Sequence, residues 1–127
     1  MPYKIFYKND GEGVITTYTG DVTDNDLLSA YHEIANLNIN ILKIKYSVTD
    51  FTDIDKYLIT AECIREQAHS SVEVSKINPN ITVIVIAPND VEYGTSRMWS
   101  AYSDKAGWEV KIFRTRDDAN LWIKNNI

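Results

Sequence analysis

The sequence predicts a single α/β domain, spanning residues 1–127, in which a single-layer mixed β-sheet is flanked by helices. Three observations predict it. The length of 127 residues is close to the commonest size of one domain. Apolar residues make up 44% and charged residues 24%, as in ordinary globular proteins. The spacing of apolar residues indicates a hairpin and then alternating helices and strands, in the order β-β-α-β-α-β-α-β-α, with about five strands and about four helices.

An N-terminal hairpin and a helix open the expected fold. Residues 3–8 have the pattern of a strand. Residues 9–13 are predicted as a turn, since Asn, Asp and Gly tolerate positive φ. Residues 14–19 are rich in β-branched and aromatic side chains and form the expected partner strand, which Gly20 closes. Apolar side chains then recur at helical spacing, which predicts a helix over residues 24–37.

The middle of the chain is expected to hold a strand, a polar loop and a long helix. Residues 41–48 alternate apolar side chains with lysines and are predicted as a strand. Residues 49–56 are predicted as a polar loop because three aspartates fall within them. Residues 57–59 form a short extended piece. Helical spacing over residues 60–77 predicts a helix, which Pro79 stops.

The strongest strand signal lies in the C-terminal half of the chain. Residues 81–87 are almost continuously β-branched, which indicates a strand buried on both faces. A helix is predicted over residues 91–106, and Gly107 supplies the left-handed conformation that ends it. A strand over residues 108–113 follows. Thr115, with an aspartate three residues later, marks the start of a last helix.

Charge and cysteine content disfavour several classes of function. The net charge of −5 disfavours nucleic-acid binding, because an acidic surface repels phosphate. The densest basic run contains Lys111, Arg114 and Arg116 and is interpreted as a solvated strand end. Cys63 is the only cysteine, so no intrachain disulfide can form. The chain shows no signal-peptide pattern and no apolar run of membrane-spanning length, so we expect a cytoplasmic protein without membrane insertion.

Motifs of known catalytic and phosphate-binding sites are absent from the sequence. His32 and His69 fall in expected helices without a second ligand at metal-binding spacing, and are interpreted as partly exposed helix residues. Cys63 is expected inside a helix, away from the helix N-terminus that would activate its thiol. We interpret it as a small apolar residue. We therefore expect no enzyme activity, no catalytic residue, no metal and no cofactor.

Acidic residues provide the first candidate site. Asp50, Asp53 and Asp55 follow a predicted strand, and carboxylates at strand ends can bind magnesium or act as general acid and base. The alternative is that they are loop and cap residues. A second candidate is the junction after the strongest strand, since ligands often bind beyond the carboxyl ends of strands in open α/β sheets. There Asn89 or Asp90 would cap the next helix, and Asp90 would compete with an anionic ligand.

The third expected helix carries two apolar stripes, one with Met98 and the other with Trp99 and Tyr102. If one stripe faces the sheet, the other is exposed unless something covers it. These three residues are therefore candidates for an interface with a protein partner or a second copy of the chain, and a wide buried face is the alternative. A further hypothesis is a small-ligand pocket between residues 50–55 and the start of this helix, with Tyr93 and Trp99 as apolar walls.

The run from Asn78 to Trp122 resembles the C-terminal half of the SpoIIAA-like domains, an uncharacterised bacterial group related to STAS domains. Residues 87–94, the pair Arg97-Met98 and residues 108–113 are the most specific stretches. The order of elements agrees over nearly the whole chain. The resemblance implies a mixed sheet flanked by helices, a relation to CRAL-TRIO lipid-binding domains, and no established enzyme activity.

STAS domains include antagonists of anti-sigma factors, in which a serine or threonine is phosphorylated where the central strand meets the next helix. The matching residues here run from Asp50 to Asp53, and the resemblance makes Thr52 the candidate for phosphorylation. The Asp-Ser-Ser or Asp-Ser-Gly setting is absent, and a phosphate on Thr52 would meet two like charges.

Three hypotheses of function follow. The first is a non-enzymatic regulatory or protein-interaction domain of STAS-like type, acting with a protein partner or as a homodimer. The alternative is a domain that binds a small hydrophobic ligand or lipid in the pocket described above. The third is an enzyme that uses the acidic residues.

Overall fold

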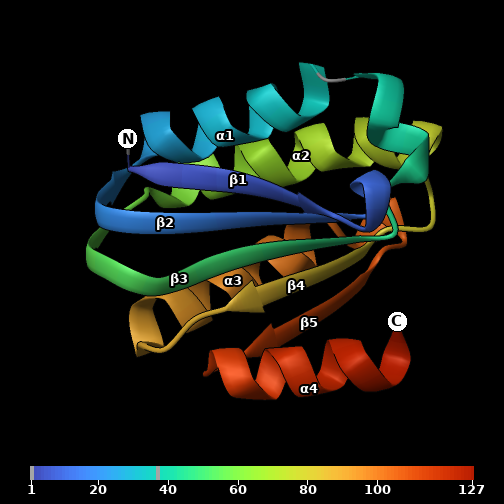
Figure 1. The fold of residues 1–127 in the computed structure, drawn as a ribbon. Coiled ribbons are helices and arrows are strands. Elements are labelled where there is room, and N and C mark those ends of the chain that lie inside the picture. Colours follow the sequence, from blue (N-terminus) through green and yellow to red (C-terminus); the bar gives the residue numbers. More distant parts are fainter. Residues whose placement is uncertain (1, 37) are drawn as a thin grey trace.

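The computed structural model describes residues 2–36 and 38–127 of the chain. Strands, α-helices and short 3-10 helices alternate along it (Figure 1). The elements are β1 (Tyr3–Lys8), η1 (Asn9–Gly11), β2 (Gly13–Thr23), α1 (Asp24–Asn36), η2 (Asn38–Lys43), β3 (Tyr46–Leu58), α2 (Ala61–Ile77), β4 (Thr82–Ile86), α3 (Asp90–Tyr102), η3 (Asp104–Ala106), β5 (Glu109–Phe113) and α4 (Arg116–Asn126).

The strands form one sheet in the order β1-β2-β3-β4-β5. Strand β1 is antiparallel to β2, and the remaining neighbours are parallel. The expected mixed sheet with an N-terminal hairpin and following strand–helix units is therefore confirmed. The hairpin turn contains Asn9, Asp10 and Gly11, which all have positive φ. Asn, Asp and Gly adopt this conformation more readily than other residues, which is why the sequence specifies the turn.

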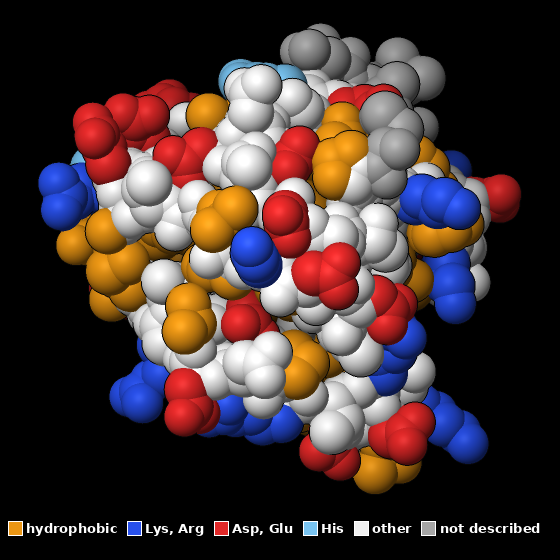
Figure 2. Space-filling view, turned by 90° about the vertical axis from the view of Figure 1, so that its left-hand side faces the viewer, with side chains coloured by type: hydrophobic (Ala, Val, Ile, Leu, Met, Phe, Trp, Pro, Cys, Tyr) orange, Lys and Arg blue, Asp and Glu red, His pale blue; other side chains and the backbone are white. Residues whose placement is uncertain are grey.

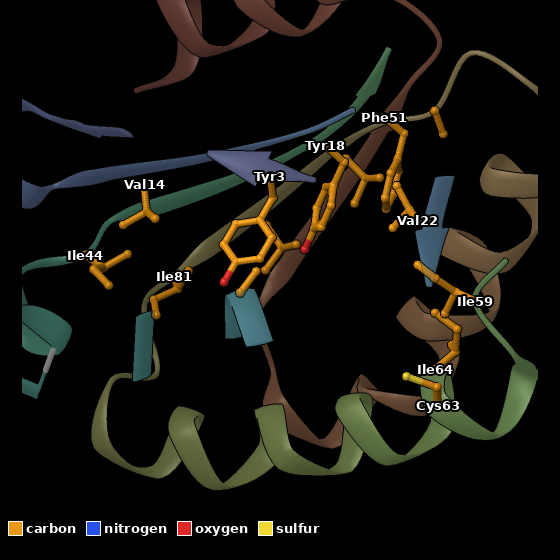
Figure 3. Packing of buried hydrophobic residues seen from close by; sticks show 14 of the residues in the cluster. Tyr3, Val14, Tyr18, Val22, Ile44, Phe51, Ile59, Cys63, Ile64 and Ile81 are labelled. Atoms are coloured by element: carbon orange, nitrogen blue, oxygen red, sulfur yellow. The ribbon is translucent and has the colours of Figure 1, made fainter. Parts of the chain in front are cut away.

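Helices α1, α2 and α3 contribute to the main core on one face of the sheet, and α4 packs against the other face beside β4 and β5. The rings of Tyr3, Tyr18 and Phe51 project from the sheet towards α2 (Figure 3). Strand β4 contributes to both faces, because Val83 and Val85 belong to the main core while Ile84 and Ile86 belong to the core under α4. This confirms the expected burial of β4 on both faces.

Strand β3 is the main difference from the expected fold. The strand predicted over residues 41–48 is replaced at its start by η2, and β3 begins at Tyr46. Residues 49–56, expected as a polar loop, lie inside β3. The reason is that β2 continues beyond the end of β4 and supplies backbone hydrogen bonds to this stretch of β3. Accordingly β2 does not end at Gly20 but runs on to Thr23.

The ends of the helices differ from the predictions by less than the bounds of β3 do. Helix α1 ends at Asn36, and the predicted end at Leu37 lies outside the described residues. Helix α3 ends at Tyr102, earlier than expected, because the next turn is the 3-10 helix η3. Gly107 has a φ of 72° and ends η3, so the left-handed stop predicted there is present but follows a different helix.

Cys63 lies in the first turn of α2, not in the helix interior as expected. Thr60 is the N-cap of α2, and its hydroxyl oxygen accepts a hydrogen bond from the backbone N–H of Cys63 over 3.2 Å. Burial raises the pKa of the Cys63 thiol to about 11, and the nearby negative charge of Asp24 contributes to the rise. The thiol is therefore protonated at neutral pH, although it lies near a helix N-terminus.

Candidate functional site

An apolar cavity of about 150 Å³ lies between the sheet and helices α1, α2 and α3. Strands β2, β3 and β4 form its floor, and every described side chain that lines it is uncharged. An engineered cavity of similar volume in another protein binds benzene, so the space is sufficient for a single ring. Phe51 and Trp99 lie in its walls, whereas Tyr93 and the acidic residues predicted as ligand sites do not. The apolar cavity therefore shares Phe51 and Trp99 with the predicted pocket, but not its acidic residues or Tyr93.

Three hydroxyl side chains interrupt the apolar floor of this cavity. Thr16 of β2 is paired with Thr49 of β3, and Ser47 lies two residues before Thr49 on the same face of β3. Thr16 is almost completely buried. Strands covered by helices usually present aliphatic side chains at such positions, as Val83 and Val85 of β4 do.

A hydrogen-bonded group of polar side chains closes the cavity on the helix side. The indole N–H of Trp99 in α3 donates to the side-chain carbonyl of Gln67 in α2. The amide nitrogen of Gln67 donates to the hydroxyl of Ser71, which in turn donates to the backbone carbonyl of Gln67. The bond between Trp99 and Gln67 joins α3 to α2 beside the cavity.

The acidic residues predicted as a loop site lie at a β-bulge in β3. Thr17 of β2 is paired with Asp50, and Thr19 with Asp53, so two residues of β3 oppose one residue of β2. Successive side chains of a strand point to opposite faces of a sheet. Phe51 therefore faces the apolar cavity, while Asp50 lines a second pocket on the opposite face, and the bulge follows Asp50.

Arg116, the first residue of α4, joins two of these acidic residues. Its Nε donates to Oδ2 of Asp50 over 2.6 Å, and its Nη2 donates to Oδ2 of Asp53, also over 2.6 Å. These hydrogen bonds raise the pKa of Arg116 above its already high usual value. The interpretation of Arg116 as part of a solvated strand end is therefore wrong, because the side chain is held by two carboxylates.

Thr52, the predicted phosphorylation site, belongs to the same cluster. Its backbone N–H and its hydroxyl both donate to Oδ1 of Asp50, over 2.9 and 2.5 Å. The residue is exposed, whereas Asp50 is almost completely buried. The structure thus brings Asp50, Thr52 and Asp53 together, and adds Arg116, which the sequence did not single out.

Asn89, Asp90 and Tyr93 lie beside a second arginine. Asn89 is the N-cap of α3, and its backbone N–H donates to the buried carboxylate of Glu92 over 2.9 Å, which confirms the predicted cap. Arg114 forms an ion pair with Asp90 over 3.0 Å, and its guanidinium lies 4.0 Å from the centre of the Tyr93 ring.

Figure 2 shows one face of the molecule, where acidic and basic side chains are interspersed with hydrophobic ones.

The predicted interface residues Met98, Trp99 and Tyr102 are half-buried and pack against the main core. Helix α2 covers part of their stripe, because Trp99 is hydrogen-bonded to Gln67 and the Arg65 guanidinium lies 5.4 Å from the centre of the Tyr102 ring. The aromatic side chains are thus engaged within the domain, as the alternative of a wide buried face predicts.

The second pocket, of about 220 Å³, lies between the sheet and α4. Asp50 and Arg116 contribute its polar wall, and Tyr46 contributes an apolar wall. The ring of Tyr46 lies directly over Gly13, where a Cβ atom would come within 2.3 Å of the ring. Gly13 is therefore required by close approach rather than by backbone conformation.

Two structural features are absent from residues 2–36 and 38–127, the part of the chain that the structure describes. These residues contain no group of three or more His, Cys, Asp or Glu side chains arranged to hold a metal ion. In the same part of the chain, no helix is both long enough and apolar enough to cross a bilayer.

The sequence did not predict the apolar cavity, although a signal for it exists. Thr16, Ser47 and Thr49 alternate with apolar residues in the strands, at positions that share one face of the sheet. Hydroxyl residues that recur on the helix-covered face are that signal. The pairing of Arg116 with Asp50 has no local sequence signal, because 66 residues separate the two.

Comparisons with known proteins support the architecture. No protein-family model matches the chain, and no curated protein is significantly similar to it. The chain is similar to the crystal structure of an uncharacterised DUF3478-family protein from Shewanella loihica PV-4 with a SpoIIAA-like fold. The match covers 94% of this chain and 90% of that chain, with a TM-score of 0.58 and 16% sequence identity. The resemblance noted in the sequence is thus confirmed for the architecture, and the chain has a SpoIIAA-like fold.

Proposed function

We propose that this domain binds a small, largely apolar molecule in the cavity between the sheet and helices α1, α2 and α3. The observation that carries the proposal is an uncharged space of about 150 Å³ inside a domain of 127 residues. Protein interiors contain few voids larger than a water molecule, so an apolar space of this volume is unusual in a small domain. Pockets lined mainly by apolar side chains with a few polar groups are typical binding sites for small molecules.

The proposed role is binding and not catalysis. Three carboxylates could serve as general acids or bases, but they lie outside the cavity lining and pair with arginines. They belong to Asp50, Asp53 and Asp90. The cavity itself presents hydroxyl, amide and indole groups, none of which is an efficient general base at neutral pH. The volume also favours a ring-sized molecule over the acyl chain of a membrane lipid.

Binding of p-xylene tests the proposal. At ten times its dissociation constant, p-xylene should raise the melting temperature of the protein by about 5 °C. Ala30 lines the cavity and is almost fully buried, so Ala30→Leu should fill the space and abolish this increase. Ala101 is exposed on α3, so Ala101→Leu is the matched control and should retain it.

Native mass spectrometry of protein from its own cells complements this test. A bound molecule that is present in the wild type and absent from Ala30→Leu would support the proposal. If neither p-xylene nor any cellular molecule binds the wild type, or if Ala30→Leu binds p-xylene as well as Ala101→Leu does, the proposal is wrong.

A second candidate function is a regulatory or protein-interaction domain switched at Thr52. The observation in its favour is that Thr52 is exposed while its hydroxyl contacts Asp50, which Arg116 also holds. A phosphate there would add about two negative charges next to Asp50 and Asp53, and would compete with them for Arg116.

The regulatory candidate is tested by a pull-down from native cells with mass analysis of the Thr52 peptide. A protein partner that is retained by the wild type and lost by Thr52→Val, together with phosphorylated Thr52, would support it. Light scattering of the same samples tests self-association. An unmodified Thr52 peptide and an identical eluate from Thr52→Val would argue against a switch at this residue.

A further inference from the structure

The floor of the apolar cavity carries a group of neighbouring hydroxyl side chains. Thr16 and Thr49 are directly paired across β2 and β3, and Ser47 is the next residue of β3 on the same face. Their hydroxyl groups therefore form one contiguous polar patch on an otherwise apolar floor. A hydroxyl group can both donate and accept a hydrogen bond, so this patch suits an occupant that carries a polar group.

Three polar side chains on the helix side of the cavity are already hydrogen-bonded. The amide of Gln67 accepts from Trp99 and donates to Ser71, and Ser71 donates to a backbone carbonyl. The bond between Trp99 and Gln67 joins α3 to α2, and a ligand that broke it would remove this link between the two helices. The polar group of a ligand is therefore better placed against the floor.

The absence of charge from the described lining restricts the ligand further. A carboxylate or ammonium group in this cavity would lose its hydration and find no side chain of opposite charge. A neutral hydroxyl or carbonyl group needs only a hydrogen bond, which the Thr16, Ser47 and Thr49 hydroxyls provide. The volume of about 150 Å³ limits the ligand to about one six-membered ring with small substituents.

We propose that the ligand is a neutral, ring-sized, mainly apolar molecule whose hydroxyl or carbonyl group hydrogen-bonds to Thr16, Ser47 and Thr49. This inference rests on the proposed binding function. It also assigns an orientation, with the polar group on the sheet and the apolar body towards α1 and α2.

The test compares three probes of nearly equal size, p-xylene, p-cresol and p-toluate, by titration calorimetry with the full chain. One net hydrogen bond increases affinity about fivefold, so wild-type protein should bind p-cresol about fivefold more tightly than p-xylene. It should bind p-toluate at least about tenfold more weakly than p-cresol. Thr49→Val keeps the shape of the side chain, and should reduce the p-cresol preference to about one while p-xylene still binds.

The matched control is Thr17→Val, since Thr17 is adjacent to Thr16 in β2 and its side chain points to the opposite face. It should retain the p-cresol preference. Retained binding of p-xylene by Thr49→Val also shows that this variant is folded with an open cavity. Should Thr49→Val unfold, Ser47→Ala replaces it with the same expectation.

The outcomes separate this inference from the proposed function. Equal wild-type affinity for p-xylene and p-cresol would overturn the inferred hydrogen bond between ligand and floor. A preference for p-cresol that survives Thr49→Val and Ser47→Ala would do the same. Either result would leave the proposed binding of apolar molecules intact. Tight binding of p-toluate would overturn the inference that the ligand is uncharged. Failure of all three probes to bind, together with the absence of a bound cellular molecule in native mass spectrometry, overturns the proposed function as well.

Discussion

The Nε atom of Arg116 lies 2.6 Å from Oδ2 of Asp50, although 66 residues separate them in the sequence. The side chain of Asp50 is only 6% exposed, whereas that of Arg116 is 41% exposed. This ion pair attaches the start of α4 to the middle of β3. Because one partner is buried and the other half-exposed, its strength should lie between that of a surface pair and that of a fully buried pair.

Replacement of Arg116 should therefore destabilise the domain. We expect Arg116→Met to lower the free energy of unfolding by about 2 kcal/mol, because Asp50 loses an ionic partner but keeps two hydrogen bonds from Thr52. Arg114→Met is the control. Its partner Asp90 is 95% exposed, so the loss should stay below about 1 kcal/mol. Urea unfolding followed by circular dichroism measures both, and equal losses would contradict the assigned role of Arg116.

Two glycine substitutions should have opposite effects. In Gly13→Ala the new Cβ would come within 2.3 Å of the buried Tyr46 ring, and we expect a loss of about 1–3 kcal/mol from overpacking. Gly94 lies inside α3, where a Cβ added to it would meet no atom within 4 Å, so Gly94→Ala should gain about 0.5–1 kcal/mol. Thermal melting of the two variants checks the signs. A neutral or stabilising Gly13→Ala would show that the ring can move freely.

A negative charge at position 52 should weaken the domain. Thr52→Glu would place a carboxylate next to Asp50 and Asp53, and we expect it to be about 1 kcal/mol less stable than the neutral control Thr52→Gln. The difference should shrink in roughly 1 M salt, which screens charges beyond about 3 Å. If the two variants are equally stable at low salt, a phosphate at Thr52 would have little electrostatic effect on the stability of the cluster.

The raised pKa of Cys63 predicts low thiol reactivity and a defined pH dependence. A pKa of about 11, against 9 for an unperturbed thiol, lowers the thiolate fraction at neutral pH by about a hundredfold. The folded protein should therefore react with Ellman's reagent at least about a hundredfold more slowly than the urea-unfolded chain. Rapid reaction of the folded protein would mean that burial does not protect the thiol.

The same shift should make stability fall at alkaline pH. The unfolded thiol loses its proton near pH 9 and the folded thiol only near pH 11. The stabilisation from a protonated Cys63 is thus complete below pH 9 and is lost as the pH rises to 11. Unfolding in urea at several pH values measures this slope, and Cys63→Ala should make it shallower. An unchanged slope in Cys63→Ala would assign the pH dependence to other groups.

Local sequence signals predicted most of the helices and the strongest strand. Thr115 was expected to cap the last helix, and its hydroxyl accepts from the backbone N–H of Asp118 over 3.2 Å. The β-branched residues of β4 fill both cores because they pack well in a strand that is covered on two faces. These features depend on residues close in sequence, which is why they can be predicted without a structure.

The extent of β3 and the candidate sites could not be predicted in the same way. Aspartates favour loops in isolation, but pairing with β2 and the contact with Arg116 stabilise Asp50 and Asp53 within a strand. The cavity depends on which faces of several elements converge. The long-range ion pair leaves no periodic pattern in the sequence, and the hydroxyl residues of β2 and β3 indicate a cavity only once their shared face is known.

The alternation of side chains along β3 places neighbours in the chain on different faces of the sheet. Phe51 is a wall of the apolar cavity, while Asp50 and Thr52, one peptide bond away on either side, belong to the charged cluster. A molecule in the cavity and a phosphate on Thr52 would therefore act on the same short piece of backbone. Thermodynamic linkage then requires reciprocity: by whatever factor a bound molecule changes the ease of charging Thr52, that charge changes the affinity for the molecule.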